Sequence, residues 1–249
     1  MRKSMKSIAE SCTKIALAEG AKEAGAAVSR VRDVTLDWRD GKVDRINEAT
    51  RRGVQLQLYV DGRYSVASSS DLRPEALEQF IADSVSNTRV LAEDPFRSLP
   101  DPALYAGQAK KDLELEDPDY ASVTPQMRRE AAKAMEDAAR AVRGADRILS
   151  VTSSFGDTRT EIVRVHSNGF EGQVERTSFV ISTEVSVKDP DGRRPEEYAY
   201  ASVRFLDQLP EAAAVGREAT ERALSRLASQ KADSARYPMV LDPRAGSRL

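Results

Sequence analysis

The sequence predicts an α+β protein of two consecutive domains, each an antiparallel sheet flanked by helices. Segments with apolar residues at every second position alternate with segments whose apolar residues recur every three or four positions. Between residues 94 and 125 neither period is present, and five prolines occur. The length of 249 residues also favours two modest cores, because long chains tend to divide into units of roughly 100–150 residues.

The first unit is predicted to contain a helix, four strands and a second helix. Residues at three- and four-residue steps form the apolar stripe of the opening helix: Met5, Ile8, Cys12, Ile15 and Ala16. This helix should end near Gly20 or Gly25. Alternating apolar residues predict strands at 34–38, 43–46, 54–60 and 63–69. Asp40-Gly41 and Asp61-Gly62 supply turns, and Pro74 suits the first position of the second helix.

The second unit is predicted to be a β-meander flanked by helices. Thr124-Pro125 marks the start of its first helix. The residues expected on the buried side of that helix are Met127, Ala131, Ala134, Ala138 and Val142. Those expected to face water are Arg128, Glu130, Lys133 and Asp137. In the closing helix, one face carries Ala213, Gly216, Thr220, Leu224 and Leu227.

Turn signals separate the strands of this second unit. The strands are expected at residues 149–155, 162–165, 170–187 and 198–205. Gly156-Asp157 is interpreted as a turn between the first two. Asn168-Gly169 is the strongest two-residue hairpin signal in the chain, and the residues from Asp189 to Gly192 form a further turn.

These elements divide the chain into four segments. We predict an N-terminal α+β domain at 1–95, a proline-rich acidic linker at 96–123, a central α+β domain at 124–235, and the beginning of a truncated C-terminal domain at 236–249. The last segment includes Tyr237–Pro243, which resembles a short strand without partners. We therefore expect the native protein to continue beyond Leu249.

Composition argues against several partners. The chain has 38 basic and 40 acidic side chains, a net charge of -2, and no block of one sign that could follow a phosphate backbone. We expect no direct binding to nucleic acid. The basic start is followed by Ser7-Ile8-Ala9-Glu10-Ser11 rather than by an apolar run, so we expect a cytoplasmic protein without a membrane anchor.

A single cysteine and a single histidine limit the possible chemistry. Cys12 has no partner for an internal disulfide, and Cys12 with His166 cannot supply the donors of a Cys/His zinc site. Cys12 is interpreted as a buried small hydrophobic residue. We assign no catalytic, cofactor-binding or metal-ligating residues to this chain and predict that it is inactive by itself.

Several polar residues have both a functional and a structural interpretation. His166 is a possible general base, but a solvated strand end is the preferred explanation, because no nucleophile or orienting partner is indicated. Ser68–Ser70 lack a nucleophile elbow and fit strand exit and helix capping. Glu196 and Glu197 are interpreted as residues that solvate a loop. Gln55, Gln57 and Tyr59 could line a groove for an extended peptide, although an ordinary wet sheet face explains them better. No glycine pattern supports nucleotide binding.

Several segments together resemble the TldD/PmbA peptidase family. The segments that resemble its amino-terminal domain are 40–44, 53–59, 61–63 and 67–72. Those that resemble its second domain and the following junction are 197–200, 222–227 and 238–244. Each segment alone is a weak signature, but their joint order is specific and spans nearly the whole chain. The resemblance implies a cytoplasmic peptidase that works as TldD/PmbA pairs on small or unfolded peptides; an older name of the family is modulator of DNA gyrase.

The resemblance also implies where the metal lies. In the TldD type, a His-Glu-x-x-x-His helix of the C-terminal part holds a divalent metal, expected to be zinc. The residues from Asp242 to Leu249 look more like the PmbA type, which lacks that helix. We therefore expect a PmbA-like subunit that pairs with a TldD-like subunit or with itself. The alternatives are an N-terminal piece of a TldD-type enzyme, with the metal helix beyond Leu249, and a non-enzymatic binding or scaffold module.

Overall fold

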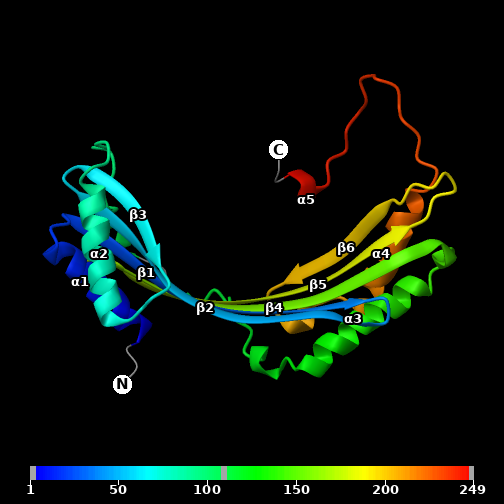
Figure 1. The fold of residues 1–249 in the computed structure, drawn as a ribbon, viewed down its shortest axis with the longest axis horizontal. Coiled ribbons are helices and arrows are strands. Elements are labelled where there is room, and N and C mark those ends of the chain that lie inside the picture. The colour runs from blue at the N-terminus through cyan, green and yellow to red at the C-terminus, as the bar shows by residue number, and fades with distance from the viewer. Residues whose placement is uncertain (1–3, 108–110, 247–249) are drawn as a thin grey trace.

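The computed structural model describes residues 4–107 and 111–246. It contains one six-stranded antiparallel sheet with the strand order β3-β2-β1-β4-β5-β6. The strands are β1 (Glu23–Arg39), β2 (Lys42–Val60), β3 (Arg63–Ser69), β4 (Ile148–His166), β5 (Glu171–Val187) and β6 (Glu196–Val203). The α-helices are α1 (Met5–Ala18), α2 (Pro74–Thr88), α3 (Pro125–Arg140), α4 (Ala212–Ser225) and α5 (Pro243–Gly246). The predicted α+β class, with antiparallel strands flanked by helices, is confirmed (Figure 1).

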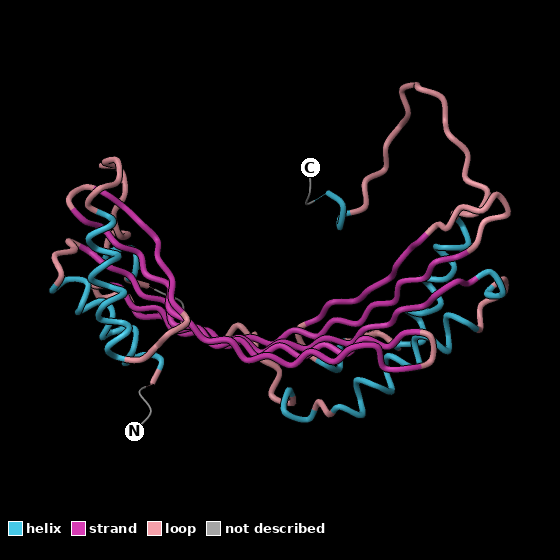
Figure 2. Tube along the Cα trace, viewed as in Figure 1, coloured by secondary structure: helices cyan, strands magenta, loops and turns pink. Residues whose placement is uncertain are grey.

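Long strands form the middle of the molecule (Figure 2). β1, β2, β4 and β5 each have 17 to 19 residues. The strands predicted at 43–46 and 54–60 are both parts of β2, so the first unit contributes three strands rather than four. The prediction failed because residues 47–53 lack an apolar alternation. This stretch of β2 borders no apolar core, so both of its faces remain polar.

The predicted turn at Gly156-Asp157 is wrong. Gly156 lies within β4 and is paired with Thr35 of β1 on one side and Val180 of β5 on the other. Its φ is not positive, so it does not use the freedom that makes glycine a turn residue. The turns predicted at Asp40-Gly41 and Asn168-Gly169 do connect paired strands, and Gly41 and Gly169 have φ of 84° and 98°.

Two apolar cores lie at opposite ends of the same sheet. The first is formed under α1 and α2 and includes Ala9, Cys12, Ala26, Val28, Leu56, Leu58, Ile81, Val85, Val163 and Val165. The second is formed under α3 and α4 and includes Leu36, Met135, Val151, Phe155, Phe179, Ile181, Val215 and Ala219. Both cores contain even-numbered residues of β1 and odd-numbered residues of β4, and these side chains point to the same face of the sheet. The helices α1 to α4 therefore cover that one face. Figure 1 shows them on the outer side of the bend. One sheet runs through both predicted domains and does not mark a limit between them. The domain limits therefore stay a prediction.

Ion pairs occupy the helix-covered face between the two cores. Arg30 Nη1 lies 3.0 Å from Glu161 Oε1, and Arg159 Nη2 lies 3.0 Å from Glu175 Oε2 and 2.6 Å from Glu116 Oε1. Charged side chains are almost never fully buried without a partner, and these pairs remain partly exposed. The charged stretch therefore explains why two separate cores form on one sheet.

The predicted orientation of α3 is wrong. Its buried residues are Arg128, Ala132, Met135, Glu136 and Ala139, whereas Met127 is exposed. Arg128 was expected to face water but is paired with Asp157 of β4. Glu136 Oε2 accepts hydrogen bonds from Trp38 Nε1 at 2.6 Å and from the Gly41 amide at 2.9 Å. Two charged residues can face the core because each has partners there.

The predicted strand at Tyr237–Pro243 is absent from the described structure. Residues 235–242 form no helix or strand, and the Val240 side chain is 97% exposed. Upstream, α4 buries Val215, Gly216, Ala219, Thr220 and Ala223, which confirms part of its predicted face. No α-helix in the described part of the chain is long and apolar enough to cross a bilayer.

Candidate functional site

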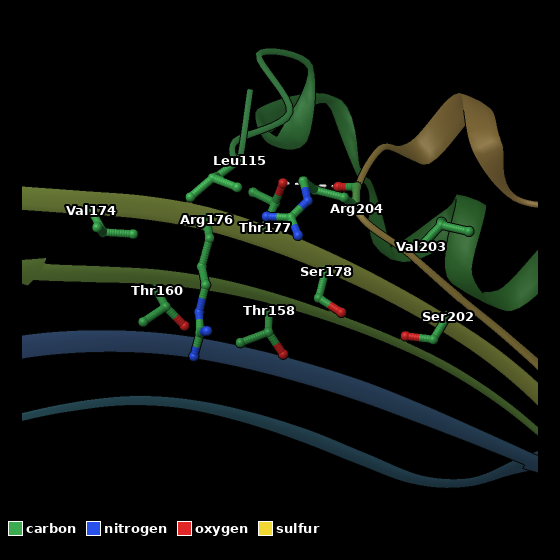
Figure 3. Close-up of a pocket in the computed structure, with 10 residues that line it drawn as sticks. All are labelled: Leu115, Thr158, Thr160, Val174, Arg176, Thr177, Ser178, Ser202, Val203 and Arg204. Atoms are coloured by element: carbon green, nitrogen blue, oxygen red, sulfur yellow. Dashed lines mark hydrogen bonds between the residues drawn. The ribbon is translucent and has the colours of Figure 1, made fainter. Parts of the chain in front are cut away.

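The candidate site is a hollow on the sheet face that the helices leave uncovered. Its volume is about 690 Å³. Its lining residues are Leu115, Thr158, Thr160, Val174, Arg176, Thr177, Ser178, Ser202, Val203 and Arg204. Figure 3 shows side chains from β4, β5 and β6 together with Leu115, which belongs to the connection between α2 and α3 (residues 89–124). The lining is mostly hydroxyl and guanidinium groups, which suits a polar ligand.

The register of the sheet assembles this hollow. Arg176 of β5 is paired with Thr160 of β4, and Ser178 with Thr158. Residues two apart on a strand point to the same face, so these four side chains lie together. The odd-numbered neighbours on β4 and β5 point the other way, towards the helices.

The hollow lies where one strand of the sheet ends. β6 pairs with β5 only at residues 179–186, so residues 171–178 have no strand on that side. The connection covers one point of this edge: Leu115 O accepts a hydrogen bond from Thr177 N at 3.0 Å. Thr177 Oγ1 donates to Arg204 O at 3.0 Å and accepts from Asp117 N at 2.8 Å. These contacts fix Arg204 and Leu115 at the rim.

Two guanidinium groups of the hollow are unpaired. Within residues 4–107 and 111–246, neither Arg176 nor Arg204 makes an ion pair, and neither guanidinium donates a hydrogen bond. This contrasts with the opposite face, where Arg30 and Arg159 bind glutamates. The hollow therefore presents positive charge that the described side chains leave uncompensated.

A second hollow, of about 770 Å³, shares Leu115 and Val174 with the first. Its charged residues are mainly acidic: Lys111, Asp112, Glu114, Glu116 and Glu175. Burial raises the pKa of Glu116, and the nearby Glu175 carboxylate adds to this effect against the opposing influence of Arg159. A hydrogen bond from Arg159 lowers the pKa of Glu175. Opposite charges thus line two adjacent parts of the surface.

His166 is not the solvated strand end that the sequence predicted. It is only 9% exposed, its Nδ1 lies 3.3 Å from Tyr105 Oη, and its ring packs against Phe170. Burial, and secondarily the charge of Arg164, lowers its pKa below 6.5. Its Nε2 is buried without a hydrogen-bond partner in the described structure. Burial therefore favours the neutral form of the ring, and the contact with Tyr105 links His166 to the connection.

The other polar residues considered in the sequence analysis make structural contacts. Ser69 Oγ accepts a hydrogen bond from the Asp71 amide, but the N-cap of α2 is Arg73, without a side-chain cap, so helix capping by the serines is wrong. Glu196 and Glu197 are neighbours on β6 and so point to opposite faces. Glu197 Oε1 accepts from Arg226 Nε at 2.6 Å, rather than only solvating a loop.

The remaining sequence candidates stay apart from the hollow. Gln55, Gln57 and Tyr59 lie on β2, at the first core's end of the sheet, and do not line it. No group of three or more His, Cys, Asp or Glu residues in the described part of the chain could hold a metal ion. Cys12 lies on the buried side of α1, whereas His166 lies on the opposite face of the sheet. These two donors therefore do not fit one zinc centre.

Sequence reasoning missed the hollow. The alternation of Thr158 with Thr160, and of Arg176 with Ser178, does signal a polar strand face. Their approach depends on the β4–β5 register, and a predicted turn at Gly156-Asp157 gave the wrong register. An uninterrupted β4 would have placed these residues opposite one another.

Comparison with known proteins supplies independent information. Residues 24–88 match the family model of the PmbA/TldA metallopeptidase domain 1, and residues 118–227 match that of the PmbA/TldA metallopeptidase central domain. Metalloprotease PmbA of Escherichia coli O157:H7 is 28% identical over 231 residues, which cover 92% of this chain and 50% of that protein.

Solved structures share the fold. A candidate modulator of DNA gyrase from Bacteroides thetaiotaomicron VPI-5482 has a TM-score of 0.89 and 35% identity, covering 98% of this chain and 55% of that one. TldE from Thermococcus kodakarensis has a TM-score of 0.71 at 15% identity, covering 87% and 47%, and this likeness concerns the fold alone. The chain spans about half the length of these relatives.

Proposed function

We infer a function from the premise that this chain belongs to the TldD/PmbA metallopeptidase family, whose domain 1 and central domain match residues 24–88 and 118–227. We propose that it is the PmbA-type component of a peptidase that processes small or unfolded peptides. In this proposal, the chain forms a wall of the substrate chamber and part of the interface with a TldD-like subunit. The similarity to a protein named Metalloprotease PmbA supports it.

The observation that carries the proposal is the uncovered polar face of the bent sheet. α1 to α4 all pack on the opposite face (Figure 1), so they leave the face with the hollow uncovered, and residues 171–176 of β5 have no strand on the side away from β4. An extended peptide needs partners for its own amides and carbonyls, and a strand edge with nearby hydroxyl groups can supply them. A folded substrate would present few such groups.

The chain's own residues do not fit a hydrolytic zinc site, because a catalytic zinc ion needs several protein donors. His166 is bound by Tyr105, and Cys12 lies in the core on the other face. In this proposal, hydrolysis depends on a metal held by a TldD-like partner or by a C-terminal domain, as the family resemblance implies. A cytoplasmic location is part of the same proposal.

Reconstitution tests this function. The chain is mixed with a TldD-like subunit that carries the His-Glu-x-x-x-His helix, and size-exclusion chromatography and hydrolysis of an unfolded peptide are measured. We expect co-elution, no hydrolysis by the chain alone, and chelator-sensitive hydrolysis by the mixture. A partner in which both metal-binding histidines are replaced by alanine is the matched control. Chelator-sensitive hydrolysis by the chain alone would overturn the proposal.

A further inference from the structure

We propose that the hollow beside β6 binds a carboxylate group of an extended peptide, through Arg176 and Arg204. The inference rests on the proposed function, because it specifies which chemical group of a peptide the uncovered face accepts. The group can come from an acidic side chain or from the C-terminus of the peptide.

The two guanidinium groups of the hollow are available to an anionic ligand. Both belong to exposed residues, both line the same hollow, and neither has an ionic partner in residues 4–107 and 111–246. A guanidinium offers planar N–H groups that match the two oxygens of a carboxylate. Arg32, in contrast, is bound to Glu48 at 2.6 Å on the helix-covered face and is not available.

Hydroxyl groups complete the set of donors. Thr160 lies opposite Arg176 in the register, and Ser178 and Ser202 lie further along the hollow (Figure 3). The Thr158 hydroxyl is already used, since it donates to Asp33 Oδ2 at 2.9 Å. That hydrogen bond partly satisfies the Asp33 carboxylate, which has no ion pair with either arginine. Charged and hydroxyl donors therefore line the same hollow.

The adjacent acidic hollow fixes where the carboxylate binds. Asp112 and Glu114 repel an anion there, and Glu116 and Glu175 already share Arg159. The boundary between the two hollows is formed by Leu115 and Val174. A peptide carboxylate is thus directed to the arginine side of this boundary.

The free edge of β5 explains why the carboxylate belongs to an extended chain. Residues 171–176 have no neighbouring strand on the side away from β4. A peptide along this edge would lie beyond the point where Leu115 O accepts the hydrogen bond from Thr177 N. Its side chains on the uncovered face would then lie over Arg176.

Fluorescence anisotropy with three short labelled peptides tests the proposal on the purified chain. The first peptide alternates Ser and Glu and has an amidated C-terminus. The second has Gln in place of each Glu and is also amidated. The third is the Gln peptide with a free C-terminal carboxylate. We expect the Glu peptide to bind about tenfold more tightly than the amidated Gln peptide, because two exposed ion pairs of about threefold each multiply to roughly that factor.

Variants of the two arginines test whether the preference for the Glu peptide over the amidated Gln peptide depends on the hollow. Arg176→Gln and Arg204→Gln should each reduce the preference about threefold, and the double variant should abolish it. Arg129→Gln is the control, since Arg129 is exposed on α3, away from the hollow. Circular dichroism and thermal unfolding verify that each variant is folded.

The outcomes separate this inference from the proposed function. Tighter binding of the third peptide than of the second supports the site and identifies the terminal carboxylate as a source. Equal binding of all three peptides, or a preference that survives in the double variant, overturns the carboxylate site but leaves peptide binding intact. If no peptide binds while the chain still co-elutes with the TldD-like subunit, the carboxylate site is overturned and the proposed assembly stands.

Discussion

Arg128 Nε of α3 lies 2.5 Å from Asp157 Oδ2 of β4, and the two side chains are only 5% and 0% exposed. The Asp157 side chain lies on the helix-covered face of β4, between Phe155 of the second core and the ion pairs of Arg159. Arg32 Nη1, at 3.7 Å from Asp157 Oδ1, extends the interaction towards the middle of β1. The Arg128–Asp157 pair thus connects α3 with β4 and, through Arg32, with the ion pairs between the two cores.

Removing one member of this pair should be costly. Arg128→Ala leaves a buried carboxylate without its main partner, and we expect a loss of about 3–5 kcal/mol in the free energy of unfolding. Urea denaturation of the variant and of the unmodified chain measures this loss. The neighbouring exposed Arg129→Ala should change stability by less than about 0.5 kcal/mol. Equal effects of the two variants would show that the pair does not stabilise the fold.

Gly216 permits the close approach of α3 and α4. A Cβ atom at this position would lie 1.9 Å from the carbonyl oxygen of Met135. Since backbone has to move to relieve that clash, Gly216→Ala should cost at least about 1–3 kcal/mol. Thermal unfolding tests this. Glu218→Ala, at an exposed position of the same helix, should shift the melting temperature far less; an unchanged melting temperature for Gly216→Ala would contradict the observed packing.

Gly25 and His166 should be coupled. A Cβ at Gly25 would lie 2.9 Å from His166 Cδ2. Gly25→Ala should therefore destabilise the chain, and His166→Ala in the same molecule should recover part of the loss. A double-mutant cycle with chemical denaturation measures this coupling, which is expected to be about 0.5–3 kcal/mol. Strictly additive effects would mean that the two residues are not in contact.

The pH dependence of stability should include a contribution from His166. Its folded-state pKa is below 6.5, so the unfolded chain binds more protons as the pH falls past that value. Full stability is present above the unfolded-state pKa and is lost as the pH falls towards the folded-state pKa. Denaturation between about pH 7 and 5 should show a smaller loss in His166→Gln than in the unmodified chain. Identical slopes for both would refute this assignment.

Much of the fold could be predicted from local signals. Thr124 caps α3 by accepting a hydrogen bond from Met127 N, Pro74 begins α2, and Gly169 and Gly192 adopt positive φ in turns. These features depend on neighbouring residues alone. The family resemblance was also carried by such turns and strands.

The misassigned features depend on residues that are distant in sequence. Arg128 is buried because of Asp157, 29 positions away, and Glu136 because of Trp38, 98 positions away. His166 is covered by Tyr105, 61 positions away. A pattern within one helix or strand contains no information about these partners. The candidate hollow was missed for the same reason, since Arg204 and Leu115 are brought to it by hydrogen bonds with Thr177, which is 27 positions from Arg204.

Photo-cross-linking in the assembly with the TldD-like subunit identifies the face of the sheet that contacts substrate. Benzoylphenylalanine is placed at Ser202, which is exposed in the hollow, or at Arg129 on the helix-covered side, and an unfolded peptide is added before irradiation. We predict a peptide adduct from position 202 and none from position 129. Adducts from position 129, or hydrolysis of the peptide with no adduct from position 202, would contradict the assignment of the uncovered face to substrate.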